Sequence, residues 1–496
     1  MDFNLVSYLP SFDNSYARLP DRFFARVDPA KAPAPALISL NRDLAAELGF
    51  DPDWLVGAEG RDFISGRVIA TGSEPIATAY AGHQFGHFTP QLGDGRAILL
   101  GEVIDIHGRR RDIQLKGAGR TPFSRGGDGR AALGPVLREY LVSEAMAALG
   151  VPTTRSLAAS LTGESVQRER ALPGASLVRV ASSHIRVGTF QYFAARQDVD
   201  GIRALADHVI ARHYPEAGRS DQPYKSLLEQ VVQAQADLIA RWMLVGFIHG
   251  VMNTDNMSVA GETIDYGPCA FMDVYDPATV FSSIDQQGRY AFGNQPQIGL
   301  WDLTRLAETL LPLLAENVDA AIAIAEGVLD AYWPRFTKTH GEGMLRKLGL
   351  ADGREGDAEL ANTNLAALER NLVDFTLLFR RLSDAVEPGP GEQRVRELFV
   401  DPTAADQLLA TWRARLAQEG RPVRDVKREM DGVNPAYIPR NHRIEAVIGA
   451  AEQGDFGPFE ELREVLSRPF DPRPEFSQYE DPPAEHERVL ATFCGT

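Results

Sequence analysis

The alternation of apolar and polar positions predicts strands early in the chain and helices later. Apolar runs over 97–104 and up to Lys116 flank a turn at HGRR, which is typical of two antiparallel strands. SLVRVASS, at 176–183, predicts a further short strand. GPVLREYLVSEAMAALG, which begins at Gly134, has apolar residues at helical spacing and a stop at Gly150. The pattern from about 86 to 190 therefore indicates a small strand-rich unit with one long helix.

Helical periodicity dominates beyond about residue 187. YKSLLEQVVQAQADLIARWMLVGFIHG predicts a long amphipathic helix that ends near Gly250, and further helices are expected over 300–335, 358–385 and 402–419. We therefore expect an α+β fold with four parts. These are an N-terminal extension that packs on two lobes, a strand-rich lobe, a helical lobe, and a C-terminal helical segment with a tail, at 1–85, 86–190, 191–425 and 426–496.

Net charge and apolar runs argue against nucleic-acid and membrane partners, and the cysteine count bears on the compartment. The chain has 496 residues and a net charge of −17, which argues against a nucleic-acid surface. Its N-terminus shows no signal-peptide pattern, and no uncharged apolar run reaches the roughly 20 residues that span a bilayer. Two cysteines suit a reducing compartment. We expect a cytoplasmic protein that binds no nucleic acid and no membrane and requires no oligomer.

A Gly turn and a strand-end lysine are the first candidate phosphate ligands. Gly93, Gly95 and Arg96 form a turn before the first strand, where bare backbone N–H groups can approach phosphate oxygens. Lys116 ends the second strand and offers a point charge. A tight hairpin and a solvated lysine are the ordinary alternatives when each is taken alone.

Two acids on the long helix are candidates to pair with Lys116. Glu139 follows the lysine by 23 residues, as a helix glutamate orients the strand lysine in protein kinases. Glu144 fits the pattern equally well, and a solvated helix face is the alternative for either acid.

HGVMNTDNMS, at 249–258, resembles a protein-kinase catalytic loop without its usual aspartate. His249 and Asn256 keep the spacing of H-R-D-x-x-x-x-N, but Val251 stands where the aspartate is expected. Asn256 and Asp265, the latter in a D-Y-G unit, are the oxygen ligands that a metal on ATP phosphates prefers. Asp255 offers a substitute base, with a loop cap or a second metal ligand as alternatives. The order of these features favours a kinase-like, bilobal nucleotide-binding fold.

Arginines surround the same region. Arg179 and Arg186 lie within SLVRVASSHIR, and other arginines lie in the Gly-rich loop that contains Asp128 and Gly129. Guanidinium forks suit phosphate oxygens, although surface arginine is the ordinary alternative for any single one.

Several long motifs go beyond a generic kinase. QLGDGRA, QLKGAGRTPFSRGGDGRAAL, VPTTRSL, SSHIRVGTFQ, HGVMNTDNMS and IDYGPCAFMD together resemble the selenoprotein O family of protein adenylyltransferases. FDNSYARLP and NPAYIPRNHRIE match as well, so the resemblance covers nearly the whole chain. The resemblance implies a kinase-like fold in which ATP lies reversed, AMP passes to Ser, Thr or Tyr hydroxyls of proteins, and pyrophosphate leaves.

The resemblance also implies roles for individual residues. Asp255 would be the base, and Asn256 and Asp265 would hold Mg²⁺ or Mn²⁺. Glu139 would orient Lys116. The residues expected to contact the nucleotide are Gly93, Gly95, Arg96, Lys116, Asp128, Gly129, Arg179 and Arg186.

Cys494 occupies the C-terminal position at which some family members carry selenocysteine. It is a candidate redox group that pairs with Cys269, and an idle thiol is the alternative. The inner cysteine of disulfide-forming members lies slightly later, at VFSSID, which argues against this pairing.

Two other functions remain open at this point. One is a kinase-like phosphotransferase that uses Asp255 on the γ-phosphate, and the other is a silent pseudokinase that binds ATP as a scaffold. Retention of Lys116 and of both candidate metal ligands argues against the pseudokinase.

Overall fold

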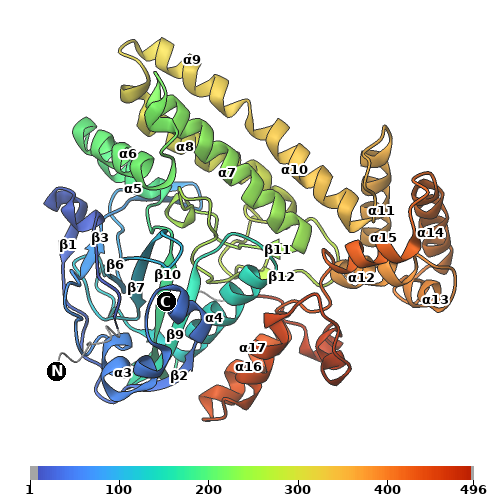
Figure 1. Cartoon of the computed structure of the whole chain (residues 1–496), viewed down its shortest axis with the longest axis horizontal. Coiled ribbons are helices and arrows are strands. Elements are labelled where there is room, and N and C mark those ends of the chain that lie inside the picture. Colours follow the sequence, from blue (N-terminus) through green and yellow to red (C-terminus); the bar gives the residue numbers. More distant parts are fainter. Residues whose placement is uncertain (1–8, 493–496) are drawn as a thin grey trace, which may run out of the picture.

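A computed structural model describes residues 9–492 and shows an antiparallel sheet beside a large helical region (Figure 1). The strand order is β1-β3-β6-β7-β10-β9-β2, and β8 pairs with β10. The strands are β1 Phe24–Arg26, β2 Ala36–Leu40, β3 Ile76–Thr78, β6 Ala97–Ile104, β7 Arg110–Lys116, β8 Ala131–Ala132, β9 Arg155–Gln167 and β10 Ala171–Ala181. The α+β class predicted from the sequence is confirmed.

The sheet has helices on both faces because side chains alternate along each strand. On β6, Ile98 and Leu100 pack in a core that contains α1, α2 and α3, whereas Leu99 belongs to the core on the opposite face, with α4. The bounds of these helices are α1 Arg42–Glu47, α2 Pro52–Val56, α3 Ala58–Ile64 and α4 Leu133–Ala148. Helix α4 is thereby fixed against β9 and β10.

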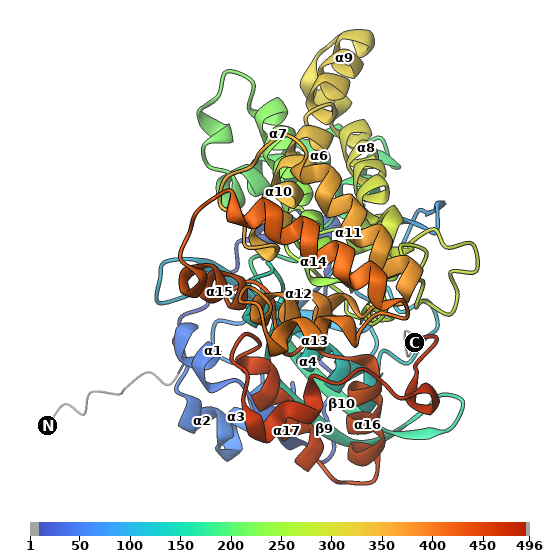
Figure 2. The same cartoon turned by 90° about the vertical axis from the view of Figure 1, so that its right-hand side faces the viewer.

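The helical region follows the sheet in the chain. Helices α7 to α10 lie side by side, and α11 to α15 enclose a second core (Figures 1 and 2). The bounds are α5 Val187–Ala194, α6 Val199–His213, α7 Pro223–Val245, α8 Gln295–Leu314, α9 Val318–Leu329, α10 Tyr332–Lys347, α11 Asp357–Asn371, α12 Phe375–Asp384, α13 Pro390–Arg396, α14 Pro402–Ala417 and α15 Val423–Asp431.

The C-terminal helices return to the sheet. Helices α16 Asn441–Glu452 and α17 Gly457–Ser467 pack on α4, on the side of the molecule shown in Figure 2. A small hairpin of β4 Gly82–Gln84 and β5 His87–Thr89 and a separate two-stranded sheet of β11 Phe247–Ile248 and β12 Ala270–Phe271 complete the fold. Among the helices within residues 9–492, none combines the length and the apolar composition that crossing a bilayer requires.

The predicted elements agree with the structure most closely around the Gly turn. The strand at 97–104 is found at those bounds, and the helix predicted from about 134 is α4. The strand expected at 176–183 is longer, since β10 begins at Ala171. The N-terminal segment supplies β1, β2 and β3 to the same sheet as β6 and β7. The four-part division of the chain stays a prediction.

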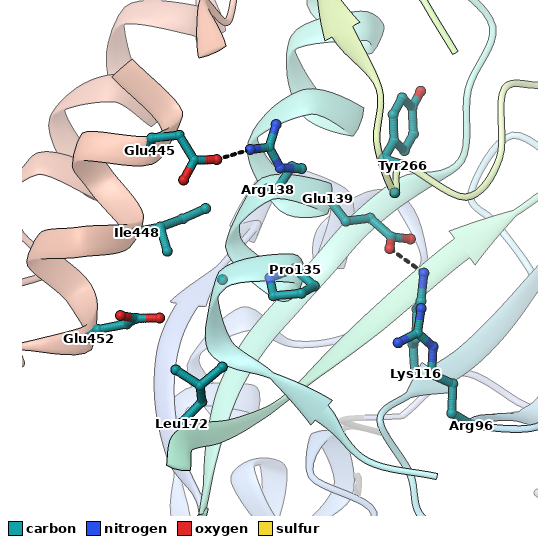
Figure 3. A pocket seen from close by; sticks show the side chains of 12 residues that line it. Arg96, Lys116, Pro135, Arg138, Glu139, Leu172, Tyr266, Glu445, Ile448 and Glu452 are labelled. Carbon is teal, nitrogen blue, oxygen red and sulfur yellow. Dashed lines mark hydrogen bonds and ion pairs between the residues drawn. The ribbon is translucent and has the colours of Figure 1, made fainter. Parts of the chain in front are cut away.

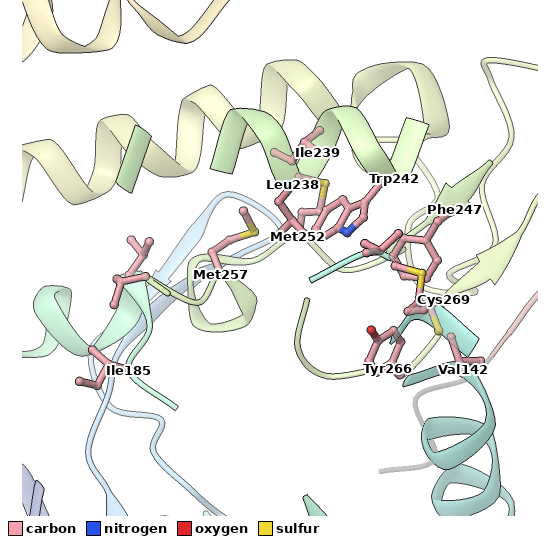
Figure 4. Close-up of a cluster of buried hydrophobic side chains, with 14 of the residues drawn as sticks. Val142, Ile185, Leu238, Ile239, Trp242, Phe247, Met252, Met257, Tyr266 and Cys269 are labelled. Atoms are coloured by element: carbon pink, nitrogen blue, oxygen red, sulfur yellow. The ribbon is translucent and has the colours of Figure 1, made fainter. Parts of the chain in front are cut away.

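A buried cluster fixes the loop that follows α7 (Figure 4). The indole Nε1 of Trp242 donates to Thr263 Oγ1 at 2.8 Å, and the ring lies against Phe247. Met252, Met257 and Tyr266 belong to the same apolar core. This packing joins the segment at 249–258 to the segment that carries Asp265.

Replacing Trp242 with phenylalanine is expected to lower the free energy of unfolding by about 1–3 kcal/mol, because the change opens a cavity and removes the buried hydrogen bond to Thr263. Denaturant unfolding measures the change. Trp333→Phe is the matched control, since Trp333 is 40% exposed, and it is expected to change the free energy much less. An equal loss in both variants would contradict a specific role for this cluster.

Candidate active site

The Gly turn is tightly packed beneath the Gly-rich loop. Asp94 is buried and accepts from the backbone N and the hydroxyl of Thr78, at 3.0 and 2.6 Å. Gly93 has φ +94°, and a Cβ there would lie 2.4 Å from the ring of Phe123. Backbone N of Gly117 donates to the carbonyl of Arg96 at 2.7 Å. Glycine is required at 93 by both its conformation and its contacts.

Five charged side chains converge at the end of β7. Lys116 Nζ lies 2.5 Å from Glu139 Oε2 on α4 and 3.3 Å from Asp265 Oδ1. Arg179 on β10 binds the same two acids, with Nη2 at 2.6 Å from Glu139 Oε1 and 2.7 Å from Asp265 Oδ1. Arg186, just before α5, reaches Asp265 Oδ2 at 2.5 Å. Three cations face two carboxylates, which leaves one positive charge in excess.

Burial sets the electrostatics of this ionic cluster. The side chains of Arg179 and Glu139 are 2% and 3% exposed. Burial opposes the charge of Asp265, but Arg179, Arg186 and Lys116 together hold the pKa of its carboxyl well below the ordinary value. Burial, reinforced by Arg179, lowers the pKa of the Lys116 ammonium. Removal of one member would leave the others charged in a poorly solvated place.

Asp255 lies on a one-turn helix at Thr254–Asn256, beside this cluster. Arg186 Nη1 donates to the backbone carbonyl of Asp255 at 2.6 Å and so joins Asp255 to Asp265. The Asp255 side chain is buried, which raises the pKa of its carboxyl to about 6. Its Oδ1 has no hydrogen-bond partner among the described residues. A buried carboxylate with one free oxygen has the properties of a proton acceptor.

His249 and Asn256, the other two residues of the kinase-like loop pattern, form hydrogen bonds to backbone carbonyls. His249 is buried and its Nε2 lies 2.9 Å from the carbonyl of Ile264, next to Asp265. Asn256 Nδ2 donates to the carbonyl of Val251 at 3.0 Å, which leaves the amide oxygen to other ligands. His249 therefore connects the loop at 249–258 to the segment that carries Asp265, and the backbone carbonyl of Val251 holds the Asn256 side chain.

Of the two candidate partners of Lys116, the structure pairs Glu139 with the lysine. Asp128 lies outside the ionic cluster and pairs with Arg168. Glu144 accepts from Arg155 and Asn41, whereas Glu139 binds Lys116. Asp128 is exposed and pairs with Arg168 at 2.8 Å.

Gly129 is buried, and a Cβ there would lie 2.1 Å from the carbonyl oxygen of Gly119. Contact of Asp128 and Gly129 with a nucleotide stays a prediction. Cys269 is buried, and Cys494 lies outside the described residues, so their pairing stays a hypothesis.

A pocket of about 280 Å³ opens beside Lys116 (Figure 3). Arg96 and Lys116 line one side, and Glu445 and Glu452 of α16 line the opposite side. Arg138 on α4 pairs with Glu445 across it. The C-terminal helix α16 therefore forms part of the wall next to the ionic cluster.

Comparisons with known proteins decide the family. The family profile described as "Protein adenylyltransferase SelO" matches residues 8–467. The chain belongs to the SelO family of protein adenylyltransferases. The sequence-based resemblance is thus confirmed, and with it the predicted enzyme class, a nucleotidyltransferase that acts on proteins.

Relatives of this SelO-family chain carry a matching name. "Protein nucleotidyltransferase YdiU" of Rhodopseudomonas palustris (strain BisB5) is 64% identical over 98% of this chain and 99% of its own length. The proteins of the same name from Bradyrhizobium sp. (strain BTAi1 / ATCC BAA-1182) and Methylorubrum populi (strain ATCC BAA-705 / NCIMB 13946 / BJ001) are 64% and 62% identical, each over 98% of this chain and 99% of its own length.

Sequence reasoning missed three residues around Asp255. The guanidinium of Arg186 lies 4.7 Å from the ring centre of Tyr80. Gln84 donates to Asp255, and a Cβ on Gly82 would clash with the Asp255 carboxylate. The run AGHQFGHF is rich in glycine and histidine, a tight-turn signal that was available in the sequence.

Proposed function

We propose that this chain transfers AMP from ATP to Ser, Thr or Tyr hydroxyls of other proteins and releases pyrophosphate. The observation that carries the proposal is the convergence of Lys116, Arg179 and Arg186 next to the buried carboxylate of Asp255. A cationic cluster with an adjacent proton acceptor suits transfer of a phosphoryl-type group to a hydroxyl.

A protein-kinase-like, bilobal arrangement is part of this proposal. Its support is the strand lysine paired with a helix glutamate at 2.5 Å, followed in the chain by the H…N loop and the D-Y-G unit. The sheet and the large helical region would form the two lobes, with the nucleotide between them.

Asp255 would accept the proton of the acceptor hydroxyl. The hydroxyl oxygen forms a bond to the α-phosphorus, and the bond from that phosphorus to the oxygen it shares with the β-phosphate breaks. The electron pair of the broken bond leaves with pyrophosphate. Arg179 and Arg186 are almost fully buried and held in place before the reaction, so they would stabilise the charge on the leaving pyrophosphate without having to reorganise.

Asn256 and Asp265 would hold Mg²⁺ or Mn²⁺. Their oxygens are the hard ligands that such ions prefer. Asp255 precedes Asn256 on the same short helix, and its Oδ1 has no hydrogen-bond partner among the described residues. Within residues 9–492, no three His, Cys, Asp or Glu side chains form a metal cluster by themselves, which suits an ion that arrives with phosphates. When bound, the ion would neutralise part of the phosphate charge.

Parallel incubations with α-labelled and γ-labelled ATP test the proposal. We expect label from the α position to enter protein and label from the γ position to appear as pyrophosphate. Transfer of γ label to protein would instead support the phosphotransferase, and absence of transfer with retained ATP binding would support the pseudokinase. Mass spectrometry of the modified protein identifies the acceptor hydroxyls.

A further inference from the structure

The small hairpin of β4 and β5 lies against the loop that carries Asp255. Its strands pair through His83 and Phe88, and its turn contains Phe85 and Gly86. The hairpin also packs on α5, which follows Arg186. Neither of its strands belongs to the main sheet, and none of the functional residues predicted from the sequence lies on the hairpin.

Backbone groups of the hairpin hold the two residues that precede Asp255. Backbone N of Phe85 donates to Asn253 Oδ1 at 3.1 Å, and backbone N of His83 donates to Thr254 Oγ1 at 2.7 Å. The hydroxyl of Thr254 in turn donates to Gln191 Oε1 at 2.6 Å. Asn253 and Thr254 therefore have fixed partners on the hairpin and on α5.

Gln84 makes the corresponding contact to Asp255 itself. Its Nε2 donates to Asp255 Oδ2 at 3.2 Å, while Oδ1 has no hydrogen-bond partner among the described residues. A Cβ at Gly82 would lie 2.6 Å from Oδ1, so only glycine leaves room for this carboxylate. Gln84 thus holds one oxygen of the carboxylate, and the other oxygen is buried against Gly82 without a hydrogen-bond partner among the described residues.

We propose that Gln84 is a positioning residue that holds Asp255 Oδ2 and thereby fixes the orientation of the carboxylate that accepts the proton of the acceptor hydroxyl. The inference rests on the function proposed above. The Asp255 carboxylate takes the hydroxyl proton as the new oxygen–phosphorus bond forms and pyrophosphate leaves. Gln84 itself exchanges no proton, because an amide N–H remains a hydrogen-bond donor throughout.

Gln84→Leu tests this role, because leucine keeps much of the volume and removes the donor. We expect kcat to fall about 10- to 100-fold, since a hydrogen bond to a charged group is lost and the base is misplaced. The KM for ATP and the unfolding temperature are expected to stay unchanged. A purely structural role would instead move the unfolding temperature together with kcat.

A double-mutant cycle with Asp255→Asn shows whether Gln84 acts through Asp255. We expect Gln84→Leu to have little further effect in the Asp255→Asn background, because residues that act as a unit are not additive. Full additivity would overturn the proposal. If the residual rate of Asp255→Asn lies below detection, the Gln84→Leu variant alone decides whether Gln84 is a positioning residue. A lower kcat with unchanged KM and unfolding temperature supports that role.

His87→Ala is the control within the same hairpin, since His87 is exposed. It is expected to keep wild-type kcat, and a loss equal to that of Gln84→Leu would overturn the proposal. Both variants are assayed with α- and γ-labelled ATP. If only γ label enters protein, AMP transfer fails as the function, while the dependence of that transfer on Gln84 is still measured.

Discussion

Asp255→Asn is expected to lower the rate of AMP transfer by about 10²- to 10⁴-fold, the usual contribution of a general base. Asparagine keeps the size of the side chain and loses its ability to accept a proton at neutral pH. ATP affinity is expected to change little, because Lys116, Arg179 and Arg186 are untouched. Transfer of α label measures the first effect, and titration calorimetry with a non-hydrolysable ATP analogue measures the second.

Asp319→Asn is the matched control for this experiment. Asp319 is exposed in the first turn of α9, and its replacement is expected to leave transfer at the wild-type rate. An Asp255→Asn variant with more than half of the wild-type rate would show that another group accepts the proton. Asp302 would then be examined, since it is a further buried carboxylate whose charge interacts with Asp255.

The order of charged residues along the chain allowed much of the ionic cluster to be predicted. Lys116 and Glu139 were predicted from a strand end and a helix 23 residues apart, and the structure joins them at 2.5 Å. The choice between Glu139 and Glu144 needed the structure. Both acids lie on α4, and only its rotation against the sheet turns Glu144 toward Arg155.

Other features depend on contacts between distant parts of the chain, which local pattern does not encode. Strand β9 reads RSLAASLTGESVQ, whose small and polar residues give a weak alternating signal, and its pairing with β10 and β2 makes it a strand. Gln84 and Asp255 are 171 residues apart, so their contact follows from the tertiary fold. Motif spacing does not predict such contacts.

Asp265→Ala is expected to abolish detectable transfer and to lower the free energy of unfolding by about 3–5 kcal/mol, because it breaks a buried ionic cluster. Arg186 would lose its only carboxylate contact among the described residues, and Arg179 would keep only Glu139. The variant also loses a proposed metal ligand. Denaturant unfolding and transfer of α label measure the two effects.

Nucleotide affinity separates these two consequences of the Asp265→Ala change. Removal of one carboxylate raises the positive charge of the cluster, so binding of ATP without metal is expected to be retained or strengthened, although transfer is lost. Asp53→Ala is the control for stability. Its carboxylate pairs with Arg42 and is 83% exposed, so its loss is expected to cost about 1 kcal/mol or less. Wild-type transfer by Asp265→Ala, or a stability loss no larger than that of Asp53→Ala, would contradict the assigned role. A variant that binds ATP but neither transfers AMP nor responds to Mg²⁺ or Mn²⁺ would place Asp265 in metal binding rather than in nucleotide capture.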